Sequence, residues 1–217
     1  MASTFGPNVS LTNLVFYVDP LNVKSYPGSG TAATNLIDNT GATLSSITYS
    51  GGAFVNAGGG VISGATSYNL SLTAGYTVMQ FMNLNTRQGG YFNYISGSNS
   101  ITLYSAGLNN MTWTTYGSGG TLYSATTIPL NTWHSWTGTF SGTGSAGGSG
   151  TANLYLNGIL DNTATQAGAT SNNATMQIGY QAGSCNGSIG PTLVWNRELS
   201  ASEVRAVHVA LKGRYGI

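Results

Sequence analysis

The stretch CNGSIGPTLVWNRELSASEV, residues 185–204, contains a turn, a strand and the start of a helix, and the fold can be worked out from it. Asn186-Gly187 is the dipeptide that most readily adopts positive φ angles, so it predicts a tight turn. Residues 189–195 are rich in β-formers and have the length of one strand. Pro191 has no backbone N–H, which predicts that this strand starts there or lies at a sheet edge.

A helix is predicted directly after this strand. Ser200 and Glu203 have the spacing of a capping box, in which each side chain accepts a hydrogen bond from a backbone N–H of the first turn. Leu199 before the cap and Val204 after it can form a hydrophobic staple. Gly213 is the expected stop. The apolar stripe of this helix consists of Val204, Val207 and Leu211.

This segment resembles the end of laminin-G-like, concanavalin A-like lectin domains. Residues 131–134 (NTWH) and residues 154–158 (LYLNG) follow in the order of that family's Trp strand and hairpin. The resemblance implies an all-β fold, a two-sheet antiparallel jelly-roll sandwich of the concanavalin A type with a short C-terminal helix. The matching residues of the closing segment are Asn186, Gly187, Ile189, Trp195, Asn196, Arg197, Leu199, Ser200 and Glu203.

Both ends of the chain are also similar to phage virion proteins. Residues 14–19 resemble the first strand of those proteins, and residues 24–30 (KSYPGSG) resemble the loop that follows it. Residues 212–216 (KGRYG) are similar to the segment with which many of them end. The usual Trp-x-Asp-Leu-Ser-Gly after the first loop is reduced here to residues 35–38 (NLID). We therefore expect an N-terminal arm, residues 1–13, and one laminin-G-like domain, residues 14–217.

Strand parity predicts which side chains face the core. In residues 76–82, Tyr76, Val78 and Met82 should share one face while Met79 and Phe81 take the other. In residues 133–140, His134, Trp136 and Phe140 should lie on one face, opposite Trp133, Ser135, Thr137 and Thr139. In the closing strand, Leu193 and Trp195 point one way and Val194 the other. One of these two faces should meet the core, and the other the terminal helix or a neighbouring subunit.

Charge is unusually scarce in this chain. Only 5% of its 217 residues are Asp, Glu, Lys or Arg, against roughly 25% in ordinary globular domains. A net charge of +1 gives no electrostatic basis for nucleic-acid binding. The N-terminus does not have the pattern of a signal peptide, and no apolar run is long enough to span a membrane. Cys185 is the single cysteine, so no internal disulfide is expected.

The acidic residues do not form a catalytic pattern. Glucanases of similar fold place their acids in an E-x-D-x-x-E arrangement, and glycoside cleavage needs two carboxyl groups across the scissile bond. No two of the five acids lie at that spacing on a strand, and no nucleophile elbow is present. Glu198 and Glu203 are five residues apart, but they are expected in the turn before the helix and in its cap. We expect no enzyme activity, no catalytic residue and no cofactor. The acids are Asp19, Asp38, Asp161, Glu198 and Glu203.

Metal binding is likewise not expected. Calcium prefers about six to eight oxygen ligands, usually with more than one carboxylate, whereas Asp19, Asp38 and Asp161 are isolated and typical of turns. His134 should pack on the core side of its strand, and His208 should lie on the flank of the helix. Neither has the neighbours of a metal ligand.

Aromatic residues remain as candidates for a binding site. Lectins stack sugar rings on exposed aromatic side chains, although about half of the aromatic residues here should lie in the core. The candidates for glycan stacking are Tyr91, Tyr94, Tyr104, Trp113, Tyr116 and Tyr123.

The resemblance implies a phage virion structural protein, in particular a capsid-surface decoration or accessory protein. The other observations alone do not name this role. We expect no attachment domain of the kind that a tail fibre needs besides its tip, so a decoration role fits better than a receptor-binding fibre. The alternative is a glycan-binding adhesin or tail-fibre protein that recognises host surface sugars, and a hydrolase is the third class. Expected partners are other virion proteins, such as a major capsid or tail protein, cell-surface glycans and further copies of the chain. The expected location is the virion.

Overall fold

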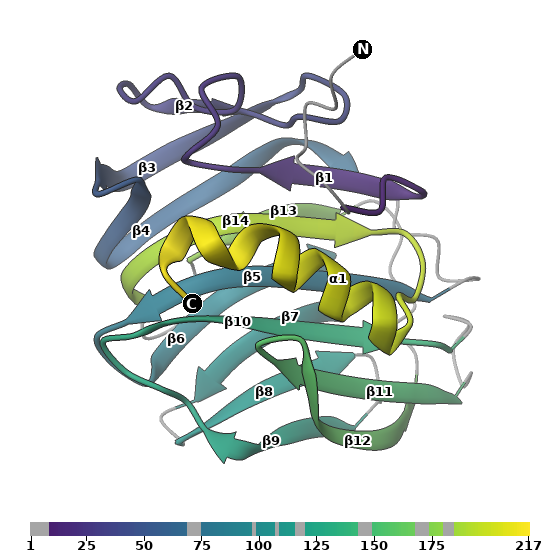
Figure 1. The fold of residues 1–217 in the computed structure, drawn as a ribbon. Coiled ribbons are helices and arrows are strands. Elements are labelled where there is room, and N and C mark those ends of the chain that lie inside the picture. Colours follow the sequence, from purple (N-terminus) through teal and green to yellow (C-terminus); the bar gives the residue numbers. More distant parts are fainter. Residues whose placement is uncertain are drawn as a thin grey trace.

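The computed structural model describes residues 9–68, 75–96, 99–106, 109–115, 120–142, 149–167, 174–179 and 185–217. These residues form fourteen strands, one α-helix and a short 3₁₀-helix (Figure 1). The strands are β1 (Leu14–Val18), β2 (Ala32–Thr34), β3 (Gly41–Ser50), β4 (Ala53–Tyr68), β5 (Tyr76–Leu84), β6 (Gln88–Ser96), β7 (Asn99–Ala106), β8 (Asn110–Thr115), β9 (Thr121–Thr127), β10 (Trp133–Phe140), β11 (Ser149–Leu156), β12 (Ile159–Ala167), β13 (Ala174–Ile178) and β14 (Asn186–Trp195). The helices are α1 (Ala201–Lys212) and η1 (Gly213–Tyr215).

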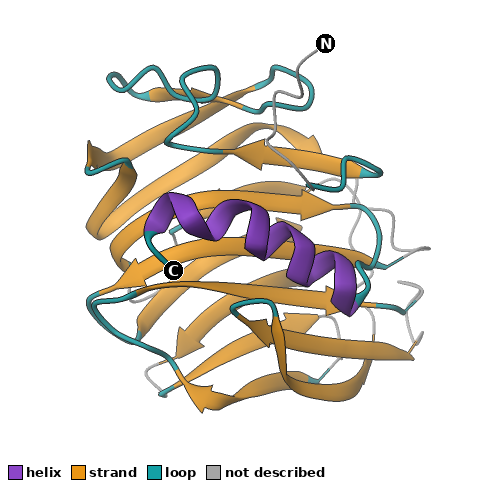
Figure 2. Ribbon diagram, in the orientation of Figure 1, coloured by secondary structure: helices purple, strands orange, loops and turns teal. Residues whose placement is uncertain are grey.

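The strands form two layers of antiparallel sheet, as Figure 2 shows. The front layer has the order β12-β11-β10-β5-β14, and β1 also pairs with β14. The rear layer has the order β13-β6-β7-β8-β9. The all-β sandwich that the sequence predicts is therefore confirmed, with its short C-terminal helix.

Strand β4 joins the two layers. Its first residues pair with β14 in the front layer, and its last residues pair with β13 in the rear layer. The glycines of residues 58–60 lie between these two parts, where β4 turns from one layer to the other. The Asn56 side chain spans this turn, because it accepts from the N–H groups of Gly58 and Gly60 and donates to the carbonyls of Gly60 and Gly179. This side-chain support for a long strand was not visible in the sequence.

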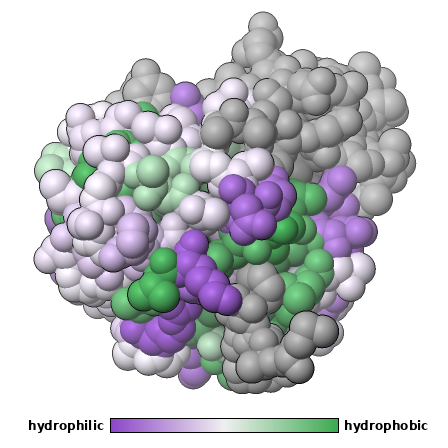
Figure 3. Space-filling model, turned by 90° about the horizontal axis from the view of Figure 1, so that it is seen from above, coloured by the Kyte–Doolittle hydropathy of each residue, from purple (hydrophilic) through white to green (hydrophobic). Residues whose placement is uncertain are grey.

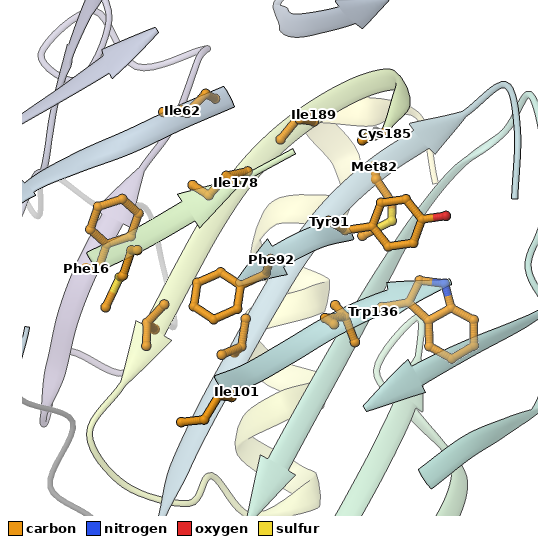
Figure 4. Packing of buried hydrophobic residues seen from close by; sticks show 14 of the residues in the cluster. Phe16, Ile62, Met82, Tyr91, Phe92, Ile101, Trp136, Ile178, Cys185 and Ile189 are labelled. Carbon is orange, nitrogen blue, oxygen red and sulfur yellow. The ribbon is translucent and has the colours of Figure 1, made fainter. Parts of the chain in front are cut away.

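The main core lies between the two layers. It is built from large side chains of both layers, such as Phe16 and Trp136 from the front and Phe92 and Ile101 from the rear (Figure 4). Trp113 reaches across from β8, and its indole N–H donates to the Thr139 carbonyl of β10. The relative position of the two layers thus depends on the close packing of these side chains and on the buried hydrogen bond of Trp113.

A second apolar cluster covers the outer face of the front layer. Helix α1 lies across β14, β5 and β10, and its Val204, Val207 and Leu211 pack on that face (Figure 1). Met79, Phe81, Leu193 and Trp195 belong to this second cluster, whereas Tyr76, Val78, Met82 and Val194 belong to the main core. The predicted parity of both strands is confirmed, and the second face of the closing strand meets the terminal helix.

The start of α1 agrees with its sequence pattern. Ser200 is the N-cap and forms the complete capping box with Glu203, while Leu199 and Val204 share the second cluster. Gly213 ends the α-helix, and the chain continues as η1 up to Gly216, which has the left-handed conformation.

The expectation for Pro191 is wrong in its detail. β14 begins at Asn186 and is paired on both sides, so Pro191 neither starts the strand nor lies at an edge. It lies where the register with β5 shifts between Ile189 and Thr192, and at such a bulge the missing N–H leaves no gap in the ladder.

The described part of the N-terminal arm is bound to the domain. Val9 is buried in the second cluster, and the Trp195 indole N–H donates to the Ser10 carbonyl. Arg197 donates to the Thr12 carbonyl and to the Ser10 hydroxyl. Within the described residues, no helix has both the length and the apolar character needed to cross a membrane.

Candidate functional site

Asp19 serves to hold the two ends of the chain together. Its carboxylate is fully buried, accepts a hydrogen bond from the Tyr17 hydroxyl and receives both terminal nitrogens of Arg214. Its backbone N–H donates to Ser25. Asp19 is thus fully engaged in a structural network.

Asp38 and Asp161 are also structural. Asp38 accepts from the Thr40 N–H, as in an Asx turn, and from the Asn35 side chain. Asp161 of β12 accepts the N–H groups of Ala125 and Thr126 in β9, at 2.7 and 3.1 Å. Since β9 and β12 end the two layers, Asp161 closes the side of the sandwich opposite to β4.

Glu203 is occupied by the helix cap and by Arg197. The Arg197 side chain contacts it with two nitrogens, and the Ser200 N–H donates to it at 2.9 Å. These hydrogen bonds, chiefly those from Arg197, lower the pKa of Glu203 to about 2.

Glu198, in contrast, is half-buried and weakly held. It lies in the turn between β14 and α1, and this turn is fixed by Thr77, whose hydroxyl donates to the Arg197 carbonyl and accepts from the Leu199 N–H. Gly75 lies close to both β10 and this turn, because a Cβ there would lie 2.2 Å from the Phe140 carbonyl oxygen and 3.3 Å from the Glu198 nitrogen. Burial raises the pKa of Glu198, while a long contact with the Thr139 hydroxyl opposes the shift.

Glu198 stands over a row of polar side chains on the outer face of the front layer. Thr77, Thr139, Asn153 and Thr163 are paired in register across β5, β10, β11 and β12. Residues paired in register point to the same face, so these side chains form one line across the sheet. We name Glu198, Asn153, Thr139 and Thr163 the Glu198 row. Asn153 donates to the Thr139 hydroxyl at 3.2 Å and accepts from the Thr163 hydroxyl at 2.8 Å.

The candidate stacking residues are not brought together as one group. Tyr91 and Trp113 are buried in the main core, at 1% and 0% exposure, so their rings are covered by protein. Tyr104 and Tyr123 both lie in register with Thr112, and therefore share the outer face of the rear layer. Tyr123 is 47% exposed. The Tyr94 side chain and the whole of Tyr116 lie outside what the structure describes.

A hollow of about 270 Å³ lies near Tyr123, where β9 meets the β11–β12 hairpin. It contains the exposed aliphatic side chains of Ile159 and Leu160 and the Asp161 carboxylate. The Asn162 amide beside it donates to the Tyr123 carbonyl. This surface is mainly aliphatic, and its one carboxylate, that of Asp161, already accepts hydrogen bonds from β9.

The histidines and the cysteine are packed inside the protein. His134 is in the main core beside Trp136, as its parity predicts, and Nδ1 lies 2.9 Å from the Thr132 carbonyl. His208 stacks on Phe81 and contacts the Ser135 hydroxyl. Burial lowers the pKa of each imidazole to about 4 and raises that of Cys185 to about 12. Among the described residues, no three His, Cys, Asp or Glu side chains gather as a metal-ion site.

Sequence reasoning assigned Glu198 to the turn and did not connect it with Asn153 or Thr163. These residues are far apart in the chain, and only the register of three strands brings them together. The one available signal was the alternation of Thr and Asn on the outward positions of β10 and β11.

Comparison with known proteins gives a family and several similar folds. The family model described as Concanavalin A-like lectin/glucanases superfamily matches residues 56–205. No curated protein matches the chain in sequence. Domain 4 of an extracellular GH43 arabinanase from Geobacillus stearothermophilus, solved with arabinotriose, has a TM-score of 0.64 and 17% identity over 90% of this chain and 98% of that chain.

Two further structures cover most of this chain but only part of their own. A Trypanosoma rangeli sialidase has a TM-score of 0.68 at 12% identity, over 96% of this chain and 34% of that one. The binding domain of botulinum neurotoxin serotype D has a TM-score of 0.69 at 13% identity, over 91% and 51%. The fold thus occurs in glycosidase-related proteins as well as in a binding domain, and does not by itself decide between catalysis and binding.

Proposed function

This chain belongs to the concanavalin A-like lectin/glucanase superfamily, and from that premise we propose that it is a phage virion structural protein, a capsid-surface decoration or accessory protein that acts by binding. Its partners would be a major capsid or tail protein and further copies of itself.

One observation carries this proposal. The segments that resemble phage virion proteins lie at opposite ends of the sequence, yet they form a single hydrogen-bonded unit. Arg214 of the KGRYG segment binds Asp19, Asp19 binds Ser25 of the KSYPGSG loop, and Asn35 accepts from the Tyr17 N–H of β1. The segments that carry the resemblance therefore lie together in the fold, and this shared position supports the proposal.

The absence of catalysis is part of the proposal. Four of the five acids accept hydrogen bonds that hold turns, the helix cap or the edges of the sandwich. Glycoside cleavage needs two carboxyl groups. Glu198 would have no second carboxyl group beside it that is not already hydrogen-bonded in a structural role.

The test is to purify virions and measure the copy number of the chain by quantitative mass spectrometry against the major capsid protein. A fixed ratio that survives gradient purification supports the proposal. Loss of the chain during purification, with normal capsids remaining, contradicts it.

The second candidate is a glycan-binding adhesin or tail-fibre protein. The Glu198 row favours it, because carboxylate, amide and hydroxyl groups in one line are suited to sugar hydroxyls. The arabinotriose complex of the similar arabinanase domain is compatible with it. Binding of sugars by the isolated chain tests this candidate separately from incorporation into virions.

A further inference from the structure

Glu198 has the weakest contacts of the five acids in this chain. Its Oε1 lies 3.5 Å from the Thr139 hydroxyl and 3.5 Å from the Asn153 amide, and both distances are at the limit of a hydrogen bond. Arg197, the nearest cation in sequence, directs its side chain to Glu203 and to the Glu198 backbone carbonyl. A half-buried carboxylate normally has better partners than this.

We propose that the Glu198 row is the subsite at which this protein binds the hydroxyl groups of a neutral glycan. This inference rests on the second candidate function, since it states where a glycan binds and of which chemical class it is.

The row offers the groups that a sugar ring needs. The Glu198 carboxylate accepts hydrogen bonds from hydroxyls, and such charge-assisted bonds are about twice as strong as neutral ones. The Asn153 amide can both donate and accept, and Thr163 is exposed at the open end of the row. A hydroxyl placed at normal hydrogen-bond distance from Oε1 replaces the two 3.5 Å contacts with a shorter one.

The charge of the row selects among sugars. A carboxylate attracts hydroxyl donors and repels the carboxylates of sialic and uronic acids, which favours neutral glycans. A calcium ion needs about six to eight oxygens, usually from several carboxylates, and Glu198 is the single acid in the row. The neighbouring ionisable groups are the Tyr155 hydroxyl, whose pKa is raised by burial and by Glu198, and Arg197.

The row is held on rigid elements. Thr77 and Thr139 are fully buried and lie on central strands of the front layer, and Thr77 fixes the turn that carries Glu198. Asn153 lies on β11 and is partly exposed, and its register partner Thr163 on β12 is exposed. The subsite therefore exists before the ligand arrives, and binding does not require ordering of these groups.

The experiment titrates the purified chain with neutral trisaccharides, namely arabinotriose, cellotriose and maltotriose, and with sialyllactose as the acidic counterpart, by calorimetry and NMR. Glu198→Gln keeps the shape of the side chain and removes its charge, Asn153→Ala removes the amide, and Thr163→Val replaces the hydroxyl by a methyl group. Val23→Ala is the control, because Val23 is exposed in the loop between β1 and β2, outside the Glu198 row. Tyr123→Ala tests the candidate stacking ring on the opposite layer.

We expect Glu198→Gln to weaken neutral trisaccharide binding about tenfold or more, from the loss of a charge-assisted hydrogen bond. Val23→Ala should leave it unchanged. Wild-type binding should weaken as the pH falls and Glu198 is protonated, and this pH dependence should be absent in Glu198→Gln. Melting curves of each variant show that the change is in binding and not in folding.

Two results overturn the subsite and are distinguishable. If neutral sugars bind but only Tyr123→Ala reduces binding, the glycan function stands and the site lies on the other layer. If the wild-type chain binds no neutral sugar, or binds sialyllactose more tightly, the subsite and its ligand class are both wrong. The virion proposal is tested by particle composition and is unaffected by either result.

Discussion

At the scale of single residues, buried polar groups hold the two ends of the chain. Asp19 is fully buried and is neutralised by Arg214, which comes from the last four residues of the sequence. Asn35 supports β1, since its side chain accepts from the Tyr17 N–H and donates to the Val15 carbonyl. The Leu36 N–H donates to the Tyr17 carbonyl beside it, so side-chain and backbone groups of residues 35–36 together hold β1.

Arg214→Ala should therefore destabilise the protein by about 3 kcal/mol or more, because it leaves the Asp19 carboxylate buried without its cation. Chemical denaturation, monitored by tryptophan fluorescence, measures this change. Arg205→Ala on the exposed side of α1 is the control and should cost less than about 0.5 kcal/mol. Equal effects of the two substitutions would contradict the structural role of Asp19.

The two buried imidazoles predict a loss of stability in acid. The pKa of both His134 and His208 is about 4 in the folded protein, below the usual 6.5. The unfolded chain therefore binds more protons between these values, and stability falls as the pH decreases from about 6.5 to 4. In His208→Gln, the free energy of unfolding should depend less on pH over this window. An unchanged slope would show that His208 is not held neutral by burial.

At the scale of elements, the contact between β8 and β10 depends on a glycine. Gly138 of β10 faces Trp113, and a Cβ at this position would lie only 2.3–2.6 Å from the indole ring. Trp113 is fully buried and bonded to the Thr139 carbonyl, so it cannot move aside without losing contacts.

Gly138→Ala should cost about 2–3 kcal/mol through overpacking. Gly41→Ala is a matched control in β3, because its Cβ would meet nothing within 4 Å and the residue has no positive φ. The melting temperatures of the two variants give the comparison. If Gly138→Ala melts like Gly41→Ala, the layers are less tightly packed than described.

Helix α1 provides the second prediction at this scale. Ser200→Ala should cost about 1 kcal/mol by loss of the N-cap. Leu199→Ala should cost about 2 kcal/mol or more, since Leu199 is buried in the second cluster. Unchanged melting temperatures for both variants would contradict the stapled helix.

Sequence patterns predicted the elements that have strong local signals. The capping box of α1 and the facing of β5, β10 and β14 follow from spacing alone, because periodicity is a local property. The length of β4 could not be predicted, since its glycine turn is supported by Asn56 and by the distant Gly179. The bulge at Pro191 was missed for the same reason, because it is defined by the register with β5.

At the scale of the whole molecule, the surface is poor in charge. Only 5% of the residues are Asp, Glu, Lys or Arg, and several of these are paired inside the fold. Figure 3 shows one face of the molecule, on which pale residues of intermediate hydropathy lie beside groups of strongly hydrophilic and hydrophobic residues, drawn in purple and green. A partner would meet this surface mainly through neutral polar and aromatic groups.

Binding to particles should therefore survive a rise from low to roughly molar salt, because screening over about 3–10 Å weakens ion pairs and leaves neutral contacts intact. Co-sedimentation with virions across a salt series measures this. Steep dissociation with salt would indicate electrostatic docking, with Arg87 and Arg205 as the first residues to substitute.

The candidate site could be predicted only in part. The sequence indicated that aromatic and neutral polar groups would dominate, but it could not separate the buried Tyr91 and Trp113 from the exposed Tyr123. It also could not show that Glu198 lies over Asn153, because strand register is a property of the folded sheet.

The crossing of β4 has a consequence for where anything can enter this protein. The two layers share a backbone ladder through β4 on one side, and Asp161 bonds β9 to β12 on the other. Separating the two layers to bind a ligand between them would therefore break the β4 ladder or the hydrogen bonds of Asp161. We therefore expect a ligand or partner to bind on the outer surface, through side chains that the fold has already positioned.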